Sequence, residues 1–206
     1  MVGAKVRDAS GSSDAGGASR IADARFARLT PVHVTVHLVR GLPTLRSLRA
    51  ARALKVAFLG GRERGDFRLV HFSVMSNHLH FIVEADDSRA LSRGMQGLLV
   101  RIARHLNSAL NRRGRVFADR FHSRVLGSTL DVKNTLLYVL NNARRHGIAI
   151  TSVVDAYSSA AWFHRWRDLE PSTRRAPVAA PRSWQLVHAC FGHGRLDRFA
   201  TPRAAP

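Results

Sequence analysis

The chain has 206 residues, of which 45% are hydrophobic, which is enough for one folded domain with tails. Its 33 Lys and Arg against 14 Asp and Glu give a net charge of +19, which favours a polyanionic partner such as nucleic acid. The single cysteine, Cys190, excludes an internal disulfide and a cysteine-based zinc site. Because no apolar run reaches the ~18 residues of a membrane-spanning helix and no signal-peptide core is visible, we expect a cytoplasmic protein without a membrane partner.

The composition divides the chain into three parts. Residues 1–24 are rich in Gly, Ala, Ser and Asp without hydrophobic periodicity, which predicts a flexible N-terminal tail. Residues 25–170 carry the periodic segments and form the predicted folded domain. Residues 171–206 begin with a proline-rich linker, continue with apolar residues around Trp184 that dock against the domain, and finish in a disordered end.

The hydrophobic pattern predicts an alternation of strands and helices. Period-2 runs indicate strands, and apolar stripes at helical spacing indicate helices. In chain order these elements are a strand at 32–38, a helix at 44–58, strands at 68–75 and 78–84 joined by a tight turn, a helix at 88–111, a strand at 116–125 and a helix at 131–145. This order predicts an α+β protein of the ferredoxin-like (split βαβ) class, an antiparallel sheet with helices on one face, extended by the last helix and the C-terminal segment.

Two histidines in the third predicted strand form the sharpest local feature. In His78-Leu79-His80-Phe81, alternate side chains share a face, so both imidazoles point away from the apolar side. Two imidazoles at this spacing can bind one metal ion, although a pair of ordinary strand histidines has the same spacing. His33 lies on the polar face of the first strand and lines the same sheet face if the two strands are neighbours. We interpret His37 as an ordinary surface histidine and Glu84 as a strand-end residue.

The last predicted helix carries a tyrosine on its polar face. At ~100° per residue, Asn142 and Arg145 fall within about 40° of Tyr138, whereas the leucines and valines lie on the opposite side. An amphipathic surface tyrosine would show the same pattern. The arrangement also presents a nucleophilic hydroxyl and an amide oxygen one turn apart, and such an oxygen can join two histidines on a hard divalent ion.

These segments resemble the tyrosine transposases of the IS200/IS605 superfamily, and within it the REP-associated tyrosine transposases. The stretch from Val74 to His80 is similar to the family's His-hydrophobic-His motif, and Leu137-Tyr138-Val139-Leu140-Asn141-Asn142 is similar to its tyrosine helix. Weaker likenesses to the family's first and fourth strands, and to its C-terminal Trp and Gly/His segment at Trp184 and Gly192-His193-Gly194, extend the resemblance over roughly residues 28–200. Two positions depart from the family pattern, since Ser76 and Ala143 stand where the family usually has proline.

The resemblance implies a metal-dependent single-stranded DNA endonuclease and strand transferase that acts through a 5′-phosphotyrosine. It assigns the nucleophile to Tyr138 and a divalent ion, Mg²⁺ or Mn²⁺, to His78, His80 and Asn142. Since a bound metal needs neutral imidazoles, cleavage is expected to fall as the pH drops through the histidine range. The REP-associated relatives imply hairpin or palindromic DNA, and the resemblance leaves open whether the enzyme is a monomer or a homodimer.

Arginine supplies most of the positive charge, and four arginines near the motifs are the candidate DNA contacts. They are Arg120, Arg124, Arg144 and Arg145. The alternative function is an inactive basic module that binds structured single-stranded DNA or RNA. A retained set of His78, His80, Tyr138 and Asn142 argues against that alternative. A zinc hydrolase is disfavoured because no acidic ligand stands at a suitable spacing.

Overall fold

The computed structural model describes residues 29–192 and 194–200, so the predicted N-terminal tail and the predicted disordered end lie outside the described residues. In chain order the elements are β1 (Thr30–His37), α1 (Leu48–Gly61), β2 (Glu63–Arg64), β3 (Phe67–Val74), β4 (His78–Ala85), α2 (Ser88–Ala109), β5 (His122–Val125), α3 (Thr129–Leu140), α4 (Asn142–Arg145), the 3₁₀ helix η2 (Ser159–Trp162) and α5 (Trp184–Phe191). Among the described residues, no helix is long and apolar enough to cross a membrane.

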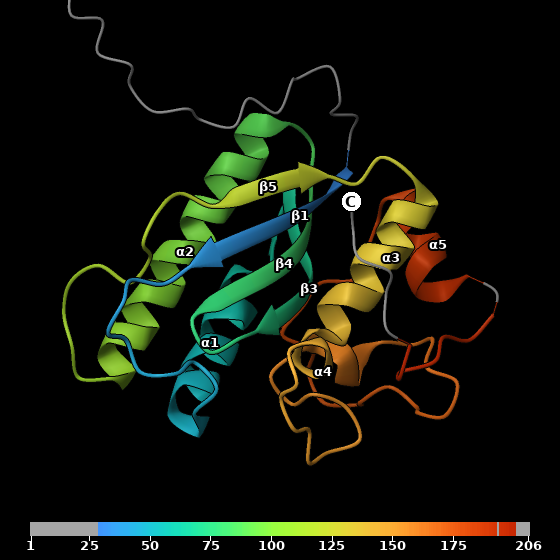
Figure 1. Ribbon diagram of the computed structural model, residues 1–206. Helices are drawn as coiled ribbons and strands as arrows, with labels where there is room; N and C mark the ends of the chain where they lie inside the picture. Colours follow the sequence, from blue (N-terminus) through green and yellow to red (C-terminus); the bar gives the residue numbers. More distant parts are fainter. Residues whose placement is uncertain (1–28, 193, 201–206) are drawn as a thin grey trace, which may run out of the picture.

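The strands form one antiparallel sheet in the order β2-β3-β4-β1-β5 (Figure 1). The β3-β4 hairpin lies beside β1, and β5 lies at the far edge. Without the short β2, this is the strand order of a split βαβ fold. The predicted fold class is therefore confirmed.

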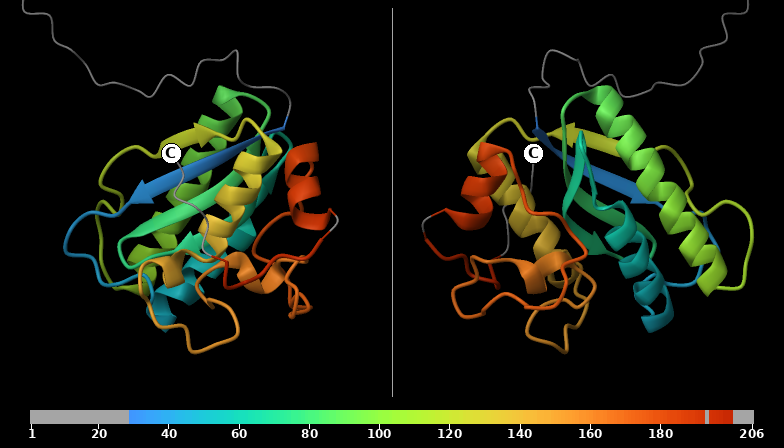
Figure 2. Two further views of the ribbon diagram at one scale, coloured as in Figure 1. Left: turned by 45° about the vertical axis from the view of Figure 1, so that its right-hand side comes forward. Right: turned by 180° about the vertical axis from the view of Figure 1, so that it is seen from behind.

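Helices cover both faces of the sheet, because β4 is apolar on one side and mixed on the other. Leu79, Phe81 and Val83 join the larger core beneath α1 and α2. Ile82 joins a second core that contains buried residues of α3 and α5. Figure 2 shows α1 and α2 on one side of the sheet and α3 with α5 on the other. The histidine face of β4 thus lies on the side that carries the predicted tyrosine helix.

Three predicted elements differ from the structure by more than the usual one or two residues at a boundary. The predicted strand at 116–125 pairs with β1 only from His122 onward, and earlier makes a single bridge between Phe117 and Leu38. The first helix begins after Ser47, whose hydroxyl accepts a hydrogen bond from the Ala50 amide, rather than at Thr44. The predicted helix 131–145 is interrupted at Asn141 and forms α3 and α4.

The segment that precedes α5 is tied to the sheet by backbone hydrogen bonds. Ala179 donates its amide to the Leu69 carbonyl on β3. The fully buried Glu84 carboxylate accepts the amides of Arg182 and Ser183 at the start of α5. Glu84 is therefore an anchor for the C-terminal segment and not merely a residue at a strand end.

Candidate active site

Pairing of β1 with β4 brings their polar side chains together on one sheet face. In the antiparallel register Thr35 lies opposite His80, and His37 lies opposite His78. His33, two residues before Thr35, reaches the same cluster. The expectation that His33 lines the face of the two motif histidines is met, because β1 pairs with β4.

His80 is the most enclosed of these histidines, with 5% of its surface exposed. Its Nδ1 lies 3.1 Å from Thr35 Oγ1 and 3.2 Å from His33 Nε2. Its Nε2 is buried and has no hydrogen-bond partner in the described structure. Buried polar atoms are nearly always paired, so this nitrogen is placed to bind something else.

His78 sits at the exposed end of β4. Its Nδ1 lies 2.9 Å from Asn77 Oδ1, and because an amide oxygen only accepts, the imidazole donates there. Its ring lies 5.3 Å from that of His37 and 6.3 Å from that of His146, measured between centroids. Sequence reasoning missed Asn77 and His146, and only the Asn-His adjacency in the turn signalled the former.

Tyr138 lies on α3 with its half-buried ring over the histidines. The ring stands edge-on to His80 at 5.4 Å and to His33 at 6.0 Å between centroids. The Arg145 guanidinium lies 5.3 Å from the tyrosine ring centroid. The apolar side of α3 is buried in the second core, so the helix is held with its polar side toward the sheet. The predicted orientation of Tyr138 away from the leucine stripe is therefore observed.

Asn142 is fully buried just after the break between α3 and α4. Neither its Oδ1 nor its Nδ2 has a hydrogen-bond partner within the described residues. An unsatisfied buried amide costs about 1–3 kcal/mol, so the Asn142 side chain does not stabilise the fold through hydrogen bonds within the described structure.

Burial keeps the site histidines uncharged. Burial is the largest cause, and with repulsion from neighbouring basic side chains it lowers the pKa of His33 and of His78 to about 4 and that of His80 to about 2, while Asp131 partly opposes the shift of His33. The imidazoles are thus free bases at neutral pH. The expected acid limit for metal binding moves from the ordinary histidine range toward about pH 4, the pKa of His78.

The tyrosine hydroxyl is subject to two opposing influences. Burial raises the pKa of Tyr138, and the nearby Arg145 cation lowers it. The first effect is larger, so the phenol is protonated at neutral pH and must lose its proton as it reacts.

The donor set suits a hard divalent ion with few protein ligands. Among residues 29–192 and 194–200, no three His, Cys, Asp or Glu side chains are placed to hold a metal. The unpartnered His80 Nε2 and Asn142 Oδ1 are the atoms such an ion would take, with His78 as the third. Nitrogen and amide-oxygen donors without thiolate fit Mg²⁺ or Mn²⁺ with waters in the other positions.

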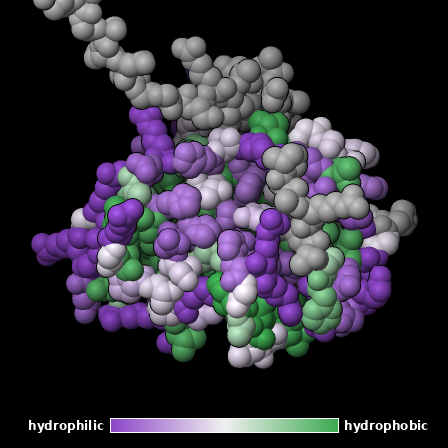
Figure 3. All heavy atoms as spheres, viewed as in Figure 1, coloured by the Kyte–Doolittle hydropathy of each residue, from purple (hydrophilic) through white to green (hydrophobic). Residues whose placement is uncertain are grey.

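The four predicted DNA-contacting arginines lie in different surroundings. Arg145 lies beside Tyr138, and Arg120 is exposed in the loop before β5. Arg124 forms an ion pair with Asp131 at 2.8 Å, and the Arg144 guanidinium lies 4.8 Å from the Phe199 ring centroid. The face that carries β1, β4 and α3 is covered largely by hydrophilic residues (Figure 3).

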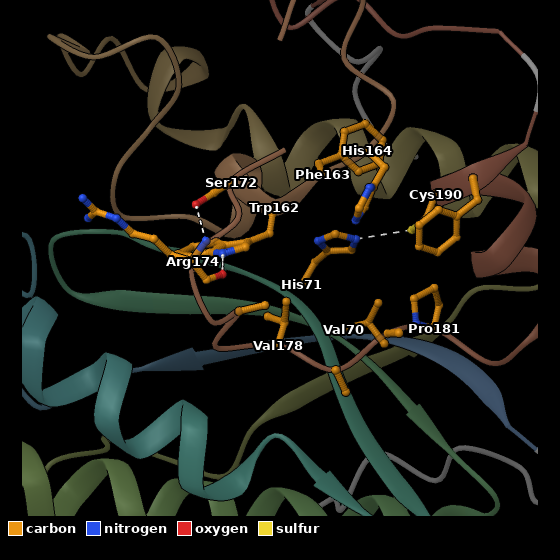
Figure 4. Close-up of a pocket in the computed structure, with 14 residues that line it drawn as sticks. Val70, His71, Trp162, Phe163, His164, Ser172, Arg174, Val178, Pro181 and Cys190 are labelled. Carbon is orange, nitrogen blue, oxygen red and sulfur yellow. Dashed lines mark hydrogen bonds between the residues drawn. The ribbon is translucent and has the colours of Figure 1, made fainter. Parts of the chain in front are cut away.

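A separate pocket of about 190 Å³ lies between β3, η2 and the C-terminal segment (Figure 4). Inside it, His71 Nδ1 lies 3.0 Å from Ser159 Oγ, and His71 Nε2 lies 3.4 Å from Cys190 Sγ. Both ring nitrogens are therefore occupied. Burial raises the pKa of the Cys190 thiol to about 12, so no thiolate forms at neutral pH. The trio stabilises the core and offers no nucleophile.

The buried His71 makes the fold sensitive to acid. Burial lowers its pKa to about 3, whereas the unfolded chain retains the ordinary value of 6.5. Between these values only the unfolded state binds the proton, so stability is full above pH 6.5 and falls as the pH decreases. Between pH 7 and pH 5 this histidine is expected to lower the free energy of unfolding of the wild type by about 2 kcal/mol. We expect this part of the loss to be absent in His71→Gln, as measured by urea unfolding at the two pH values. Ser159→Ala keeps the imidazole and serves as control. An equal loss in His71→Gln and wild type would contradict this.

Comparison with known proteins agrees with the geometry. Residues 45–142 match the model of the family described as "Transposase IS200 like", and this range includes His78, His80, Tyr138 and Asn142. No curated protein matches the chain. A solved structure of a REP-associated tyrosine transposase bound to a REP hairpin is similar in fold, with a TM-score of 0.54 and 21% identity over 71% of this chain and 85% of that one. Over residues 45–142 the chain is similar to the IS200-like transposase family, and this match supports the expected class of enzyme, a transposase.

Proposed function

We propose that the protein nicks and joins single-stranded DNA, with Tyr138 as the nucleophile and a divalent ion held by His78, His80 and Asn142. The observation that carries the proposal is the combination of three features. A half-buried tyrosine stands edge-on to His80, His80 Nε2 has no partner, and Asn142 is a buried amide without partners. The two unpartnered polar groups add no hydrogen bond to the fold, and together with the tyrosine they suit phosphoryl transfer to a phenol.

The reaction is a displacement at phosphorus. The Tyr138 oxygen bonds to the scissile phosphorus, and the bond from phosphorus to the 3′-oxygen breaks. The phenolic proton leaves, and the departing 3′-oxygen takes up a proton to become a hydroxyl. The products are a 5′-phosphotyrosine and a free 3′-end. A second 3′-hydroxyl can reverse the attack and join two strands, because the phosphodiester bond is conserved.

Each residue of the site has a distinct part in this proposal. The metal supplies Lewis-acid polarisation of the scissile phosphate when bound. His78, His80 and Asn142 would hold the ion through imidazole nitrogens and an amide oxygen. Arg145 supplies positive charge beside the phenol. The net charge of +19 favours binding of the DNA strand, and we expect that binding to weaken with salt.

Hairpin DNA is the substrate class that we propose for this chain. The support is the similar fold of a transposase whose solved structure contains a REP hairpin. The exposed arginines near the site and the hydrophilic face around it suit a folded polyanion.

An adduct assay tests the proposal. Purified protein is mixed with labelled single-stranded hairpins in Mn²⁺ and resolved on a denaturing gel. We expect label to remain attached to the protein, and EDTA to abolish it. Retention on a native gel with no adduct in any divalent metal would instead indicate the inactive binding module.

Arg145 gives a second test, because it lowers the pKa of Tyr138 against the effect of burial. We expect Arg145→Ala to slow single-turnover adduct formation at pH 7 by about tenfold at saturating DNA, and to move the pH-rate profile to higher pH. Arg144→Ala is the matched control, since that guanidinium lies over Phe199 instead. Equal rates for the two variants at every pH would contradict the assigned influence of Arg145.

A further inference from the structure

The inner ligand histidine, His80, has two hydrogen-bonding neighbours on the adjacent strand. Its Nδ1 lies 3.1 Å from Thr35 Oγ1 and 3.2 Å from His33 Nε2. The rings of His33 and His80 are nearly parallel, at 16°, with centroids 5.3 Å apart, which suits a hydrogen bond in the ring plane. On the other side of the same imidazole, Nε2 is buried without a partner.

We propose that His33 and Thr35 are positioning residues that hold the proton of His80 on Nδ1 and thereby present Nε2 as a free ligand atom. The inference rests on the proposed function, in which His80 binds the divalent ion. It assigns a role to two residues of β1 that lie outside the family match at 45–142.

The physical reason lies in the single proton that a neutral imidazole shares between two nitrogens. A proton on Nε2 would be a buried donor without an acceptor, at a cost of about 1–3 kcal/mol. A proton on Nδ1 meets two acceptors, the threonine hydroxyl and the His33 Nε2 lone pair. The hydrogen bond made by one ring nitrogen sets which nitrogen binds a metal, and such outer partners also fix the ring orientation.

The strand register explains why these two residues serve this role. Thr35 lies directly opposite His80 in the β1-β4 ladder. Ser73 lies opposite His80 from β3, but its hydroxyl has its hydrogen-bond contact with Met75 Sδ. Of the two hydroxyls that flank His80, Thr35 bonds to the imidazole and Ser73 does not. Ser73 is therefore a matched control for substitutions of Thr35.

The test measures the tautomer and the metal affinity separately. Long-range ¹H–¹⁵N spectra of the full chain without metal report which His80 nitrogen carries the proton. Electron paramagnetic resonance of free Mn²⁺ reports metal binding without DNA. We expect the Nδ1–H tautomer in the wild type, and its loss in a Thr35→Val, His33→Leu double variant together with about 10- to 100-fold weaker Mn²⁺ binding. Thr35→Ser is expected to restore the wild-type tautomer, and Ser73→Ala to bind Mn²⁺ within twofold of wild type.

Two results would overturn the inference. One is an Nε2–H tautomer of His80 in the wild type, and the other is unchanged Mn²⁺ affinity in the double variant. If the double variant does not fold, the His80 tautomer of the wild type and the tautomer and Mn²⁺ affinity of Thr35→Val alone decide whether the inference holds. Failure of the wild type to bind Mn²⁺ would count against the metal of the proposed function, while the tautomer spectra would still decide the role of His33 and Thr35.

Discussion

Replacement of Tyr138 by phenylalanine is expected to abolish the covalent DNA adduct and to leave hairpin binding within about twofold of wild type. The substitution removes the nucleophilic oxygen only, and the ring keeps its edge-on contacts with His80 and His33. Among the described residues that form the site, Tyr138 is the helical residue with a side-chain hydroxyl. The measurement is the denaturing-gel assay with a native-gel titration in parallel.

Tyr157 is the matched control, because the sequence contains only these two tyrosines. The Arg46 guanidinium lies 4.4 Å from its ring centroid, and its carbonyl accepts the Val74 amide at the end of β3, two strands away from β1. We expect Tyr157→Phe to form adduct at the wild-type rate. Adduct formation by Tyr138→Phe, with loss in Tyr157→Phe, would show that the nucleophile is misassigned.

Asn142→Ala is expected to reduce metal-dependent cleavage by at least about 100-fold while leaving the thermal stability unchanged or slightly higher. The buried side-chain amide of Asn142 makes no hydrogen bond in the described structure. Its removal therefore eliminates two unsatisfied polar atoms and breaks no hydrogen bond. The loss of activity is expected because the substitution removes one of the three proposed metal ligands and so weakens metal binding. Calorimetric melting measures the thermal stability of the variant, and an Mn²⁺-dependent cleavage assay measures its activity.

The neighbouring residue provides the opposite case. Asn141 Nδ2 donates to the Ala200 carbonyl at 3.1 Å, so Asn141→Ala removes a hydrogen bond outside the site. We expect this variant to lose about 1 kcal/mol of stability and to keep its cleavage rate. If Asn142→Ala were as destabilising as Asn141→Ala and equally active, the amide of Asn142 would have a structural role alone.

The proposed ligands and nucleophile could be predicted from local patterns. A period of two placed His78 and His80 on one strand face, as observed. A period of 3.6 predicted Tyr138 and Asn142 on one helix face, but the helix breaks at Asn141 and Asn142 begins α4. These periodicities are set by backbone geometry, so they need no knowledge of distant contacts. The same reasoning gave the order of strands and helices from which the fold class follows. Local patterns did not predict the boundaries of β5 and α1 or the break at Asn141. Helix caps and strand partners decide where elements end, and both depend on the surrounding structure.

The sequence by itself determined the fold class, the strand and helix faces and the residue types of the site. Only the tertiary structure decided which faces meet. The β1-β4 register places Thr35 and His33 against His80 Nδ1, and packing of α3 on the second core places Tyr138 over the imidazoles. The roles of Glu84 at the start of α5 and of Asn77 beside His78 were decided in the same way. Hydrogen bonds between residues about 50 or 100 positions apart leave no periodic trace in a sequence, because they depend on how separate elements pair.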